Sequence, residues 1–172
     1  MHTRNAILPD VEQIHGIIEP YAQSGTLLPR TIPELCENVR DFVVVEDQGK
    51  VIGCGALHLY GLHLAEIRSI AVHPAAKKKG AGRKLVEALI EEAQRHTVSC
   101  VCLFTRIPEF FALMGFSVAR REELPDKIYK DCLHCPSLYA CDEIAMVRGP
   151  LPTNIPAYHE ARIQIPLVRL QV

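Results

Sequence analysis

Apolar residues recur at helical spacing near the start of the chain. Four of them share one face of a predicted helix: Val11, Ile14, Ile17 and Ile18. Asp10 is placed to cap the start of this helix, and Pro20 predicts its end. The stretch TIPELCENVRDF predicts a second short helix, which begins at Thr31 and Pro33.

A longer amphipathic helix is predicted over residues 82–96, in the stretch GRKLVEALIEEAQRH. Its apolar residues gather on one face and its charges on the other. The apolar face consists of Leu85, Val86, Leu89, Ile90 and Ala93. Further along, the stretch PEFFALMGF predicts a short helix that ends at Gly115.

Apolar runs of a different kind predict strands. The stretch FVVVEDQGKVIGCGALHLYG contains two such runs joined by the polar turn DQGK, which indicates a hairpin. LAEIRSIAVHP follows as a strand that stops at Pro74, and SCVCLFT, FSVARRE and DEIAMVRG are also predicted strands. Residues 125–141 are expected to be irregular. Because strands and helices alternate in the second half, the pattern predicts one α/β domain with a mixed sheet covered by helices.

The composition limits the number of domains and the class of partner. With 172 residues, 48% of them hydrophobic, the chain is long enough for one core. We assign residues 1–149 to a single domain and leave the C-terminal tail, residues 150–172, unplaced. The 19 basic and 20 acidic residues nearly cancel. The net charge therefore predicts no nucleic-acid partner and no attraction to an anionic membrane.

Targeting signals and disulfides are not expected. The stretch MHTRNAILPDVEQ lacks the apolar segment of a signal peptide, and no apolar run approaches the roughly 20 residues of a membrane span. We therefore expect a cytoplasmic protein. The seven cysteines are odd in number and carry no sign of secretion, so a disulfide framework is not predicted.

A basic stretch with two glycines, KKKGAGRK, precedes the helix over residues 82–96. The free amides of a first helical turn, the helix dipole and nearby lysines favour an anion, and Gly80 and Gly82 allow a phosphate to approach the backbone. The simpler alternative is a solvated basic loop that caps the helix. The stretch lacks the GxxxxGK[ST] of a P-loop and the third glycine of a dinucleotide fingerprint. It also has no aromatic residue of the kind that binds nucleic acids.

The stretch EIRSIAVHPAAKKKGAGRKLVEALIEEA resembles the acetyl-CoA-binding core of the GNAT family of N-acetyltransferases. In that family [QR]xxGx[GA] follows a strand and opens a helix. Here the pattern runs from Lys77 to Gly82 and has lysine in its first position. FFALMGF is similar to a second family signature, FYxxxGF. The resemblance extends over roughly residues 3–148 and implies a mostly antiparallel central sheet flanked by helices in a single domain.

Within the family, the short, single-domain N-acetylglutamate synthases are most similar. The segments that carry this likeness are GTLLPRT, VIGCGALHLY, LAEIRSIAVHP, EFFALMGF and the following LPDKIYKDC. The likeness implies transfer of an acetyl group from acetyl-CoA to the α-amine of L-glutamate, a step of arginine biosynthesis. Two alternatives stay open: an acetyltransferase with another amine acceptor, and a non-catalytic acyl-CoA-binding or redox-sensing module. A homodimer is also compatible with the sequence.

The resemblance gives roles to residues around the predicted strand that ends at Val72. Glu66 is expected to take the proton of the attacking ammonium, directly or through a water. The alternative is an exposed charge at the start of the strand. The backbone of this strand is expected to bind pantetheine and polarise the thioester, where the sheet splays away from residues 100–105. The residues expected to bind acetyl-CoA are Ile70, Ala71, Val72, Lys77, Lys78, Lys79, Gly80, Ala81, Gly82, Arg83, Thr105 and Phe110.

The general acid differs from the family pattern. Many relatives protonate the leaving thiolate with the tyrosine of FYxxxGF, which is Phe111 here. A water, another tyrosine such as Tyr129, or no acid at all would then serve, because a thiolate leaves tolerably well without a proton.

Recognition of a dicarboxylate such as glutamate requires fixed cations, preferably arginines that bind carboxylates in a bidentate way. Arg30, between the first two helices, and Arg68, on the same strand face as Glu66, are predicted for this role. Arg106 and Lys127 are second choices, because a surface charge is the better explanation for these two residues. Arg68 could instead pair with Glu66.

Three cysteines near the C-terminal side form a possible metal site. Cys132, Cys135 and Cys141 have a spacing that suits zinc or an iron–sulfur cluster. Reduced structural cysteines or a redox-labile pair are the alternatives, and no histidine spacing supports a cysteine nucleophile. A fourth metal ligand would come from His134, Asp142, Glu143 or Cys36.

Overall fold

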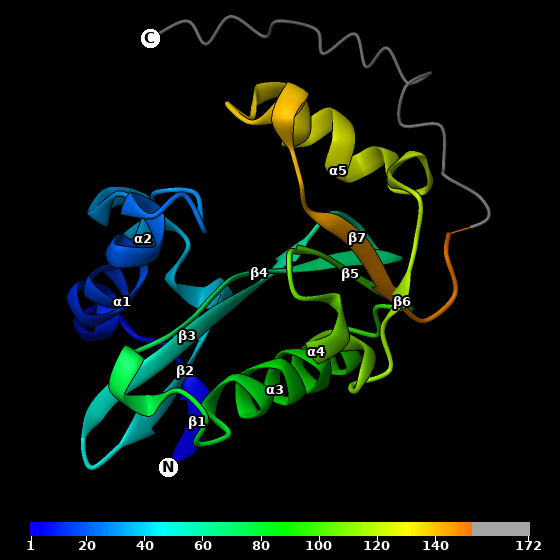
Figure 1. Cartoon of the computed structure of the whole chain (residues 1–172). Coiled ribbons are helices and arrows are strands. Elements are labelled where there is room, and N and C mark those ends of the chain that lie inside the picture. The colour runs from blue at the N-terminus through cyan, green and yellow to red at the C-terminus, as the bar shows by residue number, and fades with distance from the viewer. Residues whose placement is uncertain (153–172) are drawn as a thin grey trace, which may run out of the picture.

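A seven-stranded sheet forms the centre of the protein, which a computed structural model describes over residues 1–152 (Figure 1). The predicted tail lies almost wholly outside these residues. The strands run in the order β1-β2-β3-β4-β5-β7-β6. All neighbours are antiparallel except β4 and β5, which confirms the mixed, mostly antiparallel sheet. The strands are β1 (His2–Asn5), β2 (Phe42–Asp47), β3 (Lys50–Leu59), β4 (Leu64–Val72), β5 (Cys100–Thr105), β6 (Ser117–Val118) and β7 (Ile144–Arg148).

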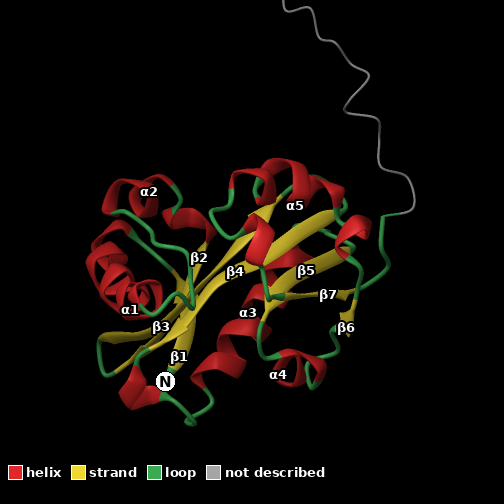
Figure 2. Ribbon diagram, turned by 45° about the horizontal axis from the view of Figure 1, so that its top comes forward, coloured by secondary structure: helices red, strands yellow, loops and turns green. Residues whose placement is uncertain are grey.

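Helices cover both faces of this sheet. They are α1 (Val11–Gln23), α2 (Ile32–Glu37), α3 (Ala81–Arg95), α4 (Pro108–Ala112) and α5 (Pro125–Lys130). Figures 1 and 2 show α3 and α4 on one face, and α1, α2 and α5 on the other. Within residues 1–152, no helix combines the length and the apolar character that crossing a bilayer requires. The result is a single α/β domain of three layers.

The alternation of side chains along the strands builds a separate core on each face. Val43 and Val45 of β2 pack with the apolar face of α3. Phe42 and Val44 of the same strand pack with α1 and α2. A third cluster, which includes Cys100 and Cys102 of β5, lies under α5. The face that carries α1 and α5 therefore has two cores, with the middle of β4 between them.

Three elements differ from the sequence prediction. Helix α1 runs past Pro20 to Gln23, because a proline in the last turn removes only one backbone hydrogen bond. Strand β6 has two residues, since the chain turns into a short 3-10 helix at Arg121–Glu123. Residues 125–141 are not irregular throughout, because they begin with α5, whose first residue is Pro125.

Strands β4 and β5 separate soon after they meet, as the sequence analysis expected. Only Leu64–Glu66 pairs with Cys100–Cys102. Ser69 has a left-handed φ of 55°, and the register of β4 against β3 shifts at the same place. This extra residue is a β-bulge, which bends the strand. The second half of β4 therefore has one backbone edge that β5 does not cover.

Gly149 is required where the chain leaves β7. Its φ is 98°, and an added Cβ would lie 2.1 Å from the carbonyl oxygen of Ser99. We expect Gly149→Ala to lower the free energy of unfolding by about 2 kcal/mol or more, measured by denaturant titration. Gly16→Ala is the control, because Gly16 lies inside α1 with open space around its Cα, and alanine there should raise stability by up to about 1 kcal/mol. Equal effects of the two changes would contradict this account.

Candidate active site

Glu66 is a buried carboxylate in the middle of the sheet. It is the third residue of β4, and it is 3% exposed. The alternative of an exposed charge at the strand start is therefore wrong. The burial is possible because polar groups surround the carboxylate: Tyr60 Oη lies 2.7 Å from Oε2, and Lys127 Nζ lies 2.8 Å from Oε1.

Asp131 completes a group of five side chains that we call the Glu66 cluster: Tyr60, Glu66, Arg68, Lys127 and Asp131. Asp131 Oδ2 lies 2.5 Å from Tyr60 Oη, 3.1 Å from Lys127 Nζ and 3.6 Å from Arg68 Nη1. Arg68 Nη1 also lies 4.0 Å from Glu66. Two carboxylates thus share two cations and one phenol. The predicted pairing of Arg68 with Glu66 is present as the longest contact of the cluster.

The cluster holds its members in defined charge states. Burial alone would lower the pKa of Lys127, but Glu66 and Asp131 raise it on balance. Burial alone would raise the pKa of Asp131, but the hydrogen bond from Tyr60 and the charge of Lys127 lower it. Burial, and then the charge of Glu66, raises the pKa of Tyr60. The site therefore contains a protonated phenol, an ammonium and an ionised Asp131 at neutral pH.

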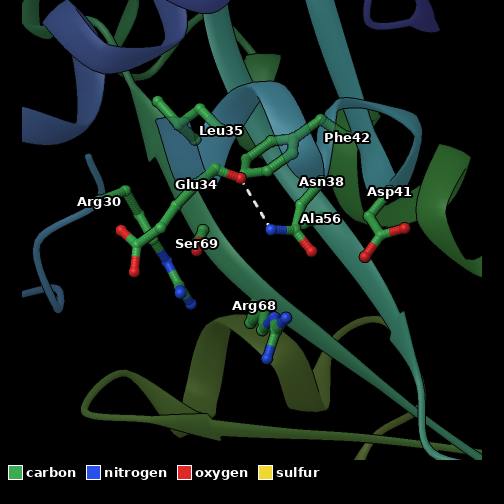
Figure 3. A pocket seen from close by; sticks show the side chains of 9 residues that line it. All are labelled: Arg30, Glu34, Leu35, Asn38, Asp41, Phe42, Ala56, Arg68 and Ser69. Atoms are coloured by element: carbon green, nitrogen blue, oxygen red, sulfur yellow. Dashed lines mark hydrogen bonds between the residues drawn. The ribbon is translucent and has the colours of Figure 1, made fainter. Parts of the chain in front are cut away.

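A small, shallow pocket adjoins the cluster beside α2. Figure 3 shows the guanidinium groups of Arg30 and Arg68 directed into it. Burial, and then the charge of Arg68, lowers the pKa of Arg30. In residues 1–152 no carboxylate forms an ion pair with Arg30. The two predicted arginines are thus brought together, and the charges of Glu34, Glu66 and Asp131 only partly offset the effect of burial on Arg30. The pocket is lined by Arg30, Glu34, Leu35, Asn38, Asp41, Phe42, Ala56, Arg68 and Ser69.

The glycine-containing loop lies at the other end of β4. Gly80 is the N-cap of α3 with a φ of 85°, and no side chain caps the helix. The amides of the first turn, Ala81 to Arg83, have no acceptor within the helix. Lys77, Lys78 and Lys79 are exposed beside them. The residues fit a phosphate-bearing ligand, because free amides, a helix dipole and cations converge there.

The remaining predicted acetyl-CoA residues lie near this loop or at the end of β5. A Cβ on Gly82 would lie 3.6 Å from Phe110 and 3.8 Å from Val72, so these three residues meet closely. Residues 70–72 form the edge of β4 that β5 does not cover, and the carbonyl oxygen of Val72 accepts a hydrogen bond from Tyr21 Oη at 2.6 Å. The hydroxyl of Thr105 accepts a hydrogen bond from the amide of Ile107 at 3.0 Å, which gives it a structural role at the end of β5.

The residues considered for the general acid belong to other elements than Glu66. Phe111 of α4 is 5% exposed and packs edge-on against Phe110 and Phe116, as a core residue does. Tyr129 of α5 is 57% exposed. Tyr60 contacts the buried carboxylate directly, at 2.7 Å.

Arg106 and Lys127, the second choices for binding the substrate carboxylates, lie in different parts of the structure. Lys127 lies inside the Glu66 cluster. Arg106 lies outside the pocket, where it binds Asp142 at 2.7 Å and the carbonyl oxygen of Thr26 at 3.0 Å. It therefore joins the loop that contains Arg30 to the segment before β7.

The predicted metal site does not form. Within the described residues, no group of three or more metal-ligating side chains is close enough to hold an ion. Cys132 and Cys141 lie in or beside separate 3-10 turns. The sulfur of Cys141 instead lies 3.1 Å from Arg121 Nη2. A spacing in the sequence that suits metal ligation therefore does not bring the three thiols together in the described structure.

Sequence reasoning missed Tyr60 and Asp131. Tyr60 follows β3, and its amide donates to the carbonyl oxygen of Leu64, so the tight β3–β4 turn returns the chain past it. The short connection YGLH between two predicted strands could have suggested that Tyr60 lies near Glu66. Asp131 lies in the segment LPDKIYKDC, which gives it no role, and it is 71 residues away from Tyr60.

Comparisons with known proteins identify the family. The model of the Acetyltransferase (GNAT) family matches residues 9–116, well over half of the chain. The chain belongs to the GNAT family. A relative from Chlorobaculum tepidum, called an uncharacterized N-acetyltransferase, is 43% identical over 84% of this chain and 94% of its own length. An amino-acid acetyltransferase from Mycobacterium tuberculosis is 38% identical over 66% of this chain and 67% of its own length.

Solved structures agree with this GNAT assignment. A Mycobacterium tuberculosis protein in complex with CoA and a second ligand has a TM-score of 0.76 and 29% identity, over 88% of this chain and all of that chain. The N-acetylglutamate synthase of Neisseria gonorrhoeae, in complex with coenzyme A and N-acetyl-glutamate, has a TM-score of 0.78 and 29% identity. That match covers 87% of this chain and 35% of the synthase chain. The protein is an acetyl-CoA-dependent N-acetyltransferase, so the non-catalytic alternative is set aside.

Lys127 is expected to stabilise the fold through its two carboxylates. We expect Lys127→Met to lower the free energy of unfolding by about 1–3 kcal/mol at pH 7, since it leaves both carboxylates without their ammonium. The measurement is denaturant unfolding across pH, with the exposed Lys50→Met as control.

The pH dependence follows from the directions of the pKa shifts. The folded pKa of Asp131 is lowered, so its contribution is present above about pH 4 and is lost as the pH falls through the folded pKa. The folded pKa of Lys127 is raised, so its contribution is lost only in strongly alkaline solution. The difference between wild type and Lys127→Met should therefore shrink below about pH 4. A difference that grows toward acid would contradict this account.

Proposed function

We propose that the protein acetylates the α-amine of L-glutamate with acetyl-CoA. The observation that carries the proposal is the pair of guanidinium groups, Arg30 and Arg68, beside the buried carboxylate of Glu66. A small dicarboxylic amino acid offers two anions to the arginines and one ammonium to the carboxylate. The pocket thus has the complement of charges that such an acceptor needs.

The relatives support an amino-acid acceptor. Their names include amino-acid acetyltransferase, and one similar solved structure is an N-acetylglutamate synthase. On this proposal the product would be N-acetylglutamate, which would place the enzyme in arginine biosynthesis. The predicted homodimer and the cytoplasmic location stay predictions.

The chemistry begins with the ammonium of the acceptor. Glu66 takes one proton, and the free amine attacks the carbonyl carbon of the thioester. The amide bond forms, the carbon–sulfur bond breaks, and the electron pair leaves on the sulfur of CoA. The thiolate takes the second amine proton, directly or through water. Phe111 has no acidic hydrogen, so no protein acid is assigned to this step.

Acetyl-CoA would bind between the separated strands. The amides of the first turn of α3 would hold the pyrophosphate, and Lys77, Lys78 and Lys79 would add charge around it. The uncovered edge of β4 at residues 70–72 would pair with the pantetheine arm and polarise the thioester carbonyl. Glu66 lies in the same strand as this edge, so the acceptor pocket and the thioester would meet along β4.

A different amine acceptor is the second candidate, because enzymes of one fold change substrates through loops. Two arginines at the pocket disfavour a polyamine, whose ammonium groups they would repel. A monocarboxylic amino acid would use only one of them.

Turnover with a panel of free amino acids tests the acceptor. We expect the release of thiol from acetyl-CoA to be faster with L-glutamate than with any other amino acid of the panel. Arg30→Ala should raise the KM for glutamate about tenfold to a hundredfold, because it removes one charge-assisted contact. The KM for acetyl-CoA should stay unchanged. Arg40→Ala, an exposed arginine outside the pocket, should match wild type. Wild-type turnover of another amino acid in preference to glutamate would refute the proposal.

Glu66→Gln tests the base. The amide keeps the size of the side chain but cannot take a proton, so kcat should fall about a hundredfold to ten-thousandfold. The Kd for CoA, measured by calorimetry, should stay within about twofold of wild type, since Glu66 lies outside the loop at α3. If Glu66→Gln keeps the wild-type kcat, Glu66 is not the base.

A further inference from the structure

The acetyl transfer releases one proton per turnover, and Glu66 is poorly placed to return that proton to water. An ammonium and acetyl-CoA react to an amide, CoA thiol and one proton. The side chain of Glu66 is 4% exposed, whereas that of Asp131 is 29% exposed. Before the next turnover, the proton on Glu66 has to reach the surface.

Tyr60 bridges the buried carboxylate and the more exposed one. Its Oη lies 2.7 Å from Glu66 Oε2 and 2.5 Å from Asp131 Oδ2. A phenol has a single hydrogen, and ionised carboxylates only accept, so Tyr60 donates to one of them at a time. Both contacts become hydrogen bonds at once when Glu66 carries a proton and donates it to Tyr60, while Tyr60 donates to Asp131. Both hydrogen bonds of Tyr60 are therefore made in the state that follows proton abstraction, in which Glu66 carries a proton.

We propose that Tyr60 and Asp131 form a proton relay that returns the proton of the acceptor amine from Glu66 to solvent. In one step, the O–H bond of the Glu66 carboxyl breaks and a new bond forms to Tyr60 Oη. At the same time the original O–H bond of Tyr60 breaks, and Asp131 receives that hydrogen. The phenol is unchanged, Glu66 is a carboxylate again, and Asp131 passes the proton to water. This inference rests on the proposed function, because it moves the proton that the acceptor loses.

The other members of the cluster cannot replace Tyr60 as carriers. Lys127 Nζ also contacts both carboxylates, at 2.8 Å and 3.1 Å. An ammonium has three donor hydrogens and no lone pair, so it cannot accept a proton before it has lost one. The guanidinium of Arg68 has the same limitation. Lys127 and Arg68 instead keep two carboxylates close together, and Tyr60 is the only member that both accepts and donates.

Asp131 is suited to the last position. The hydrogen bond from Tyr60 and the charge of Lys127 outweigh its burial and lower the pKa of its carboxyl. A proton that arrives on Asp131 is therefore released to water rather than held. The relay runs from a buried carboxylate to a more exposed one.

The test compares Tyr60→Phe with wild type in steady-state turnover, with imidazole added as a small diffusible base. The change removes one oxygen and keeps the ring that packs against His58. We expect kcat to fall about tenfold or more, with the KM of both substrates within about twofold. Imidazole should restore part of the rate of Tyr60→Phe and leave wild type unchanged. Tyr139→Phe, in which the tyrosine is 99% exposed, should match wild type.

Asp131→Asn is the second variant, and it should show the same loss of kcat and the same response to imidazole. An unchanged kcat in Tyr60→Phe would overturn the relay. So would a loss of kcat that imidazole does not relieve, because this would indicate a structural role. If the wild-type enzyme acetylates another amine but not glutamate, only the proposed acceptor is wrong. The relay is then tested with that amine as the substrate. Wild type that acetylates no amine defeats both.

Discussion

The separation of β4 from β5 is the constraint on which the other features depend. The two strands hold together over three residue pairs, and the bulge at Ser69 then bends β4. A continuous sheet would satisfy every backbone group of β4 internally. The separation leaves the edge of residues 70–72 uncovered, and it ends the paired segment at Glu66. One backbone irregularity thus positions both a binding edge and a buried carboxylate.

The buried charge is tolerated because two cations and one hydrogen-bonding phenol meet it from three parts of the chain. Tyr60 comes from the β3–β4 turn, Arg68 from β4 and Lys127 from α5. An isolated carboxylate at this depth would be very unfavourable. The α5 segment is therefore more than a cover for the third core. Its docking brings the ammonium of Lys127 to within 2.8 Å of Glu66 Oε1.

The sequence predicted the elements with strong local patterns and was less successful where distant segments meet. The hairpin at DQGK, the strand to Val72 and the helix after Gly80 follow from periodicity and turn chemistry, and the structure confirms them. Helix α5 has six residues, too few for a periodic signal. The sequence therefore did not indicate a role for Asp131, at the end of this helix, or the Glu66 cluster to which Asp131 belongs. The cysteine spacing suggested a metal, but spacing alone does not fix the directions of the thiols.

Arg106 links the loop of Arg30, which lines the pocket, to a segment outside the pocket. It binds the carbonyl oxygen of Thr26 in that loop and Asp142 in the segment that follows α5. A movement of the segment that follows α5 would therefore be transmitted to the loop of Arg30. The side chains of Arg106 and Asp142 are 38% and 63% exposed, so dissolved salt can weaken their attraction. Ionic strength is thus an external control on how firmly the pocket holds its shape, although no ion needs to enter it.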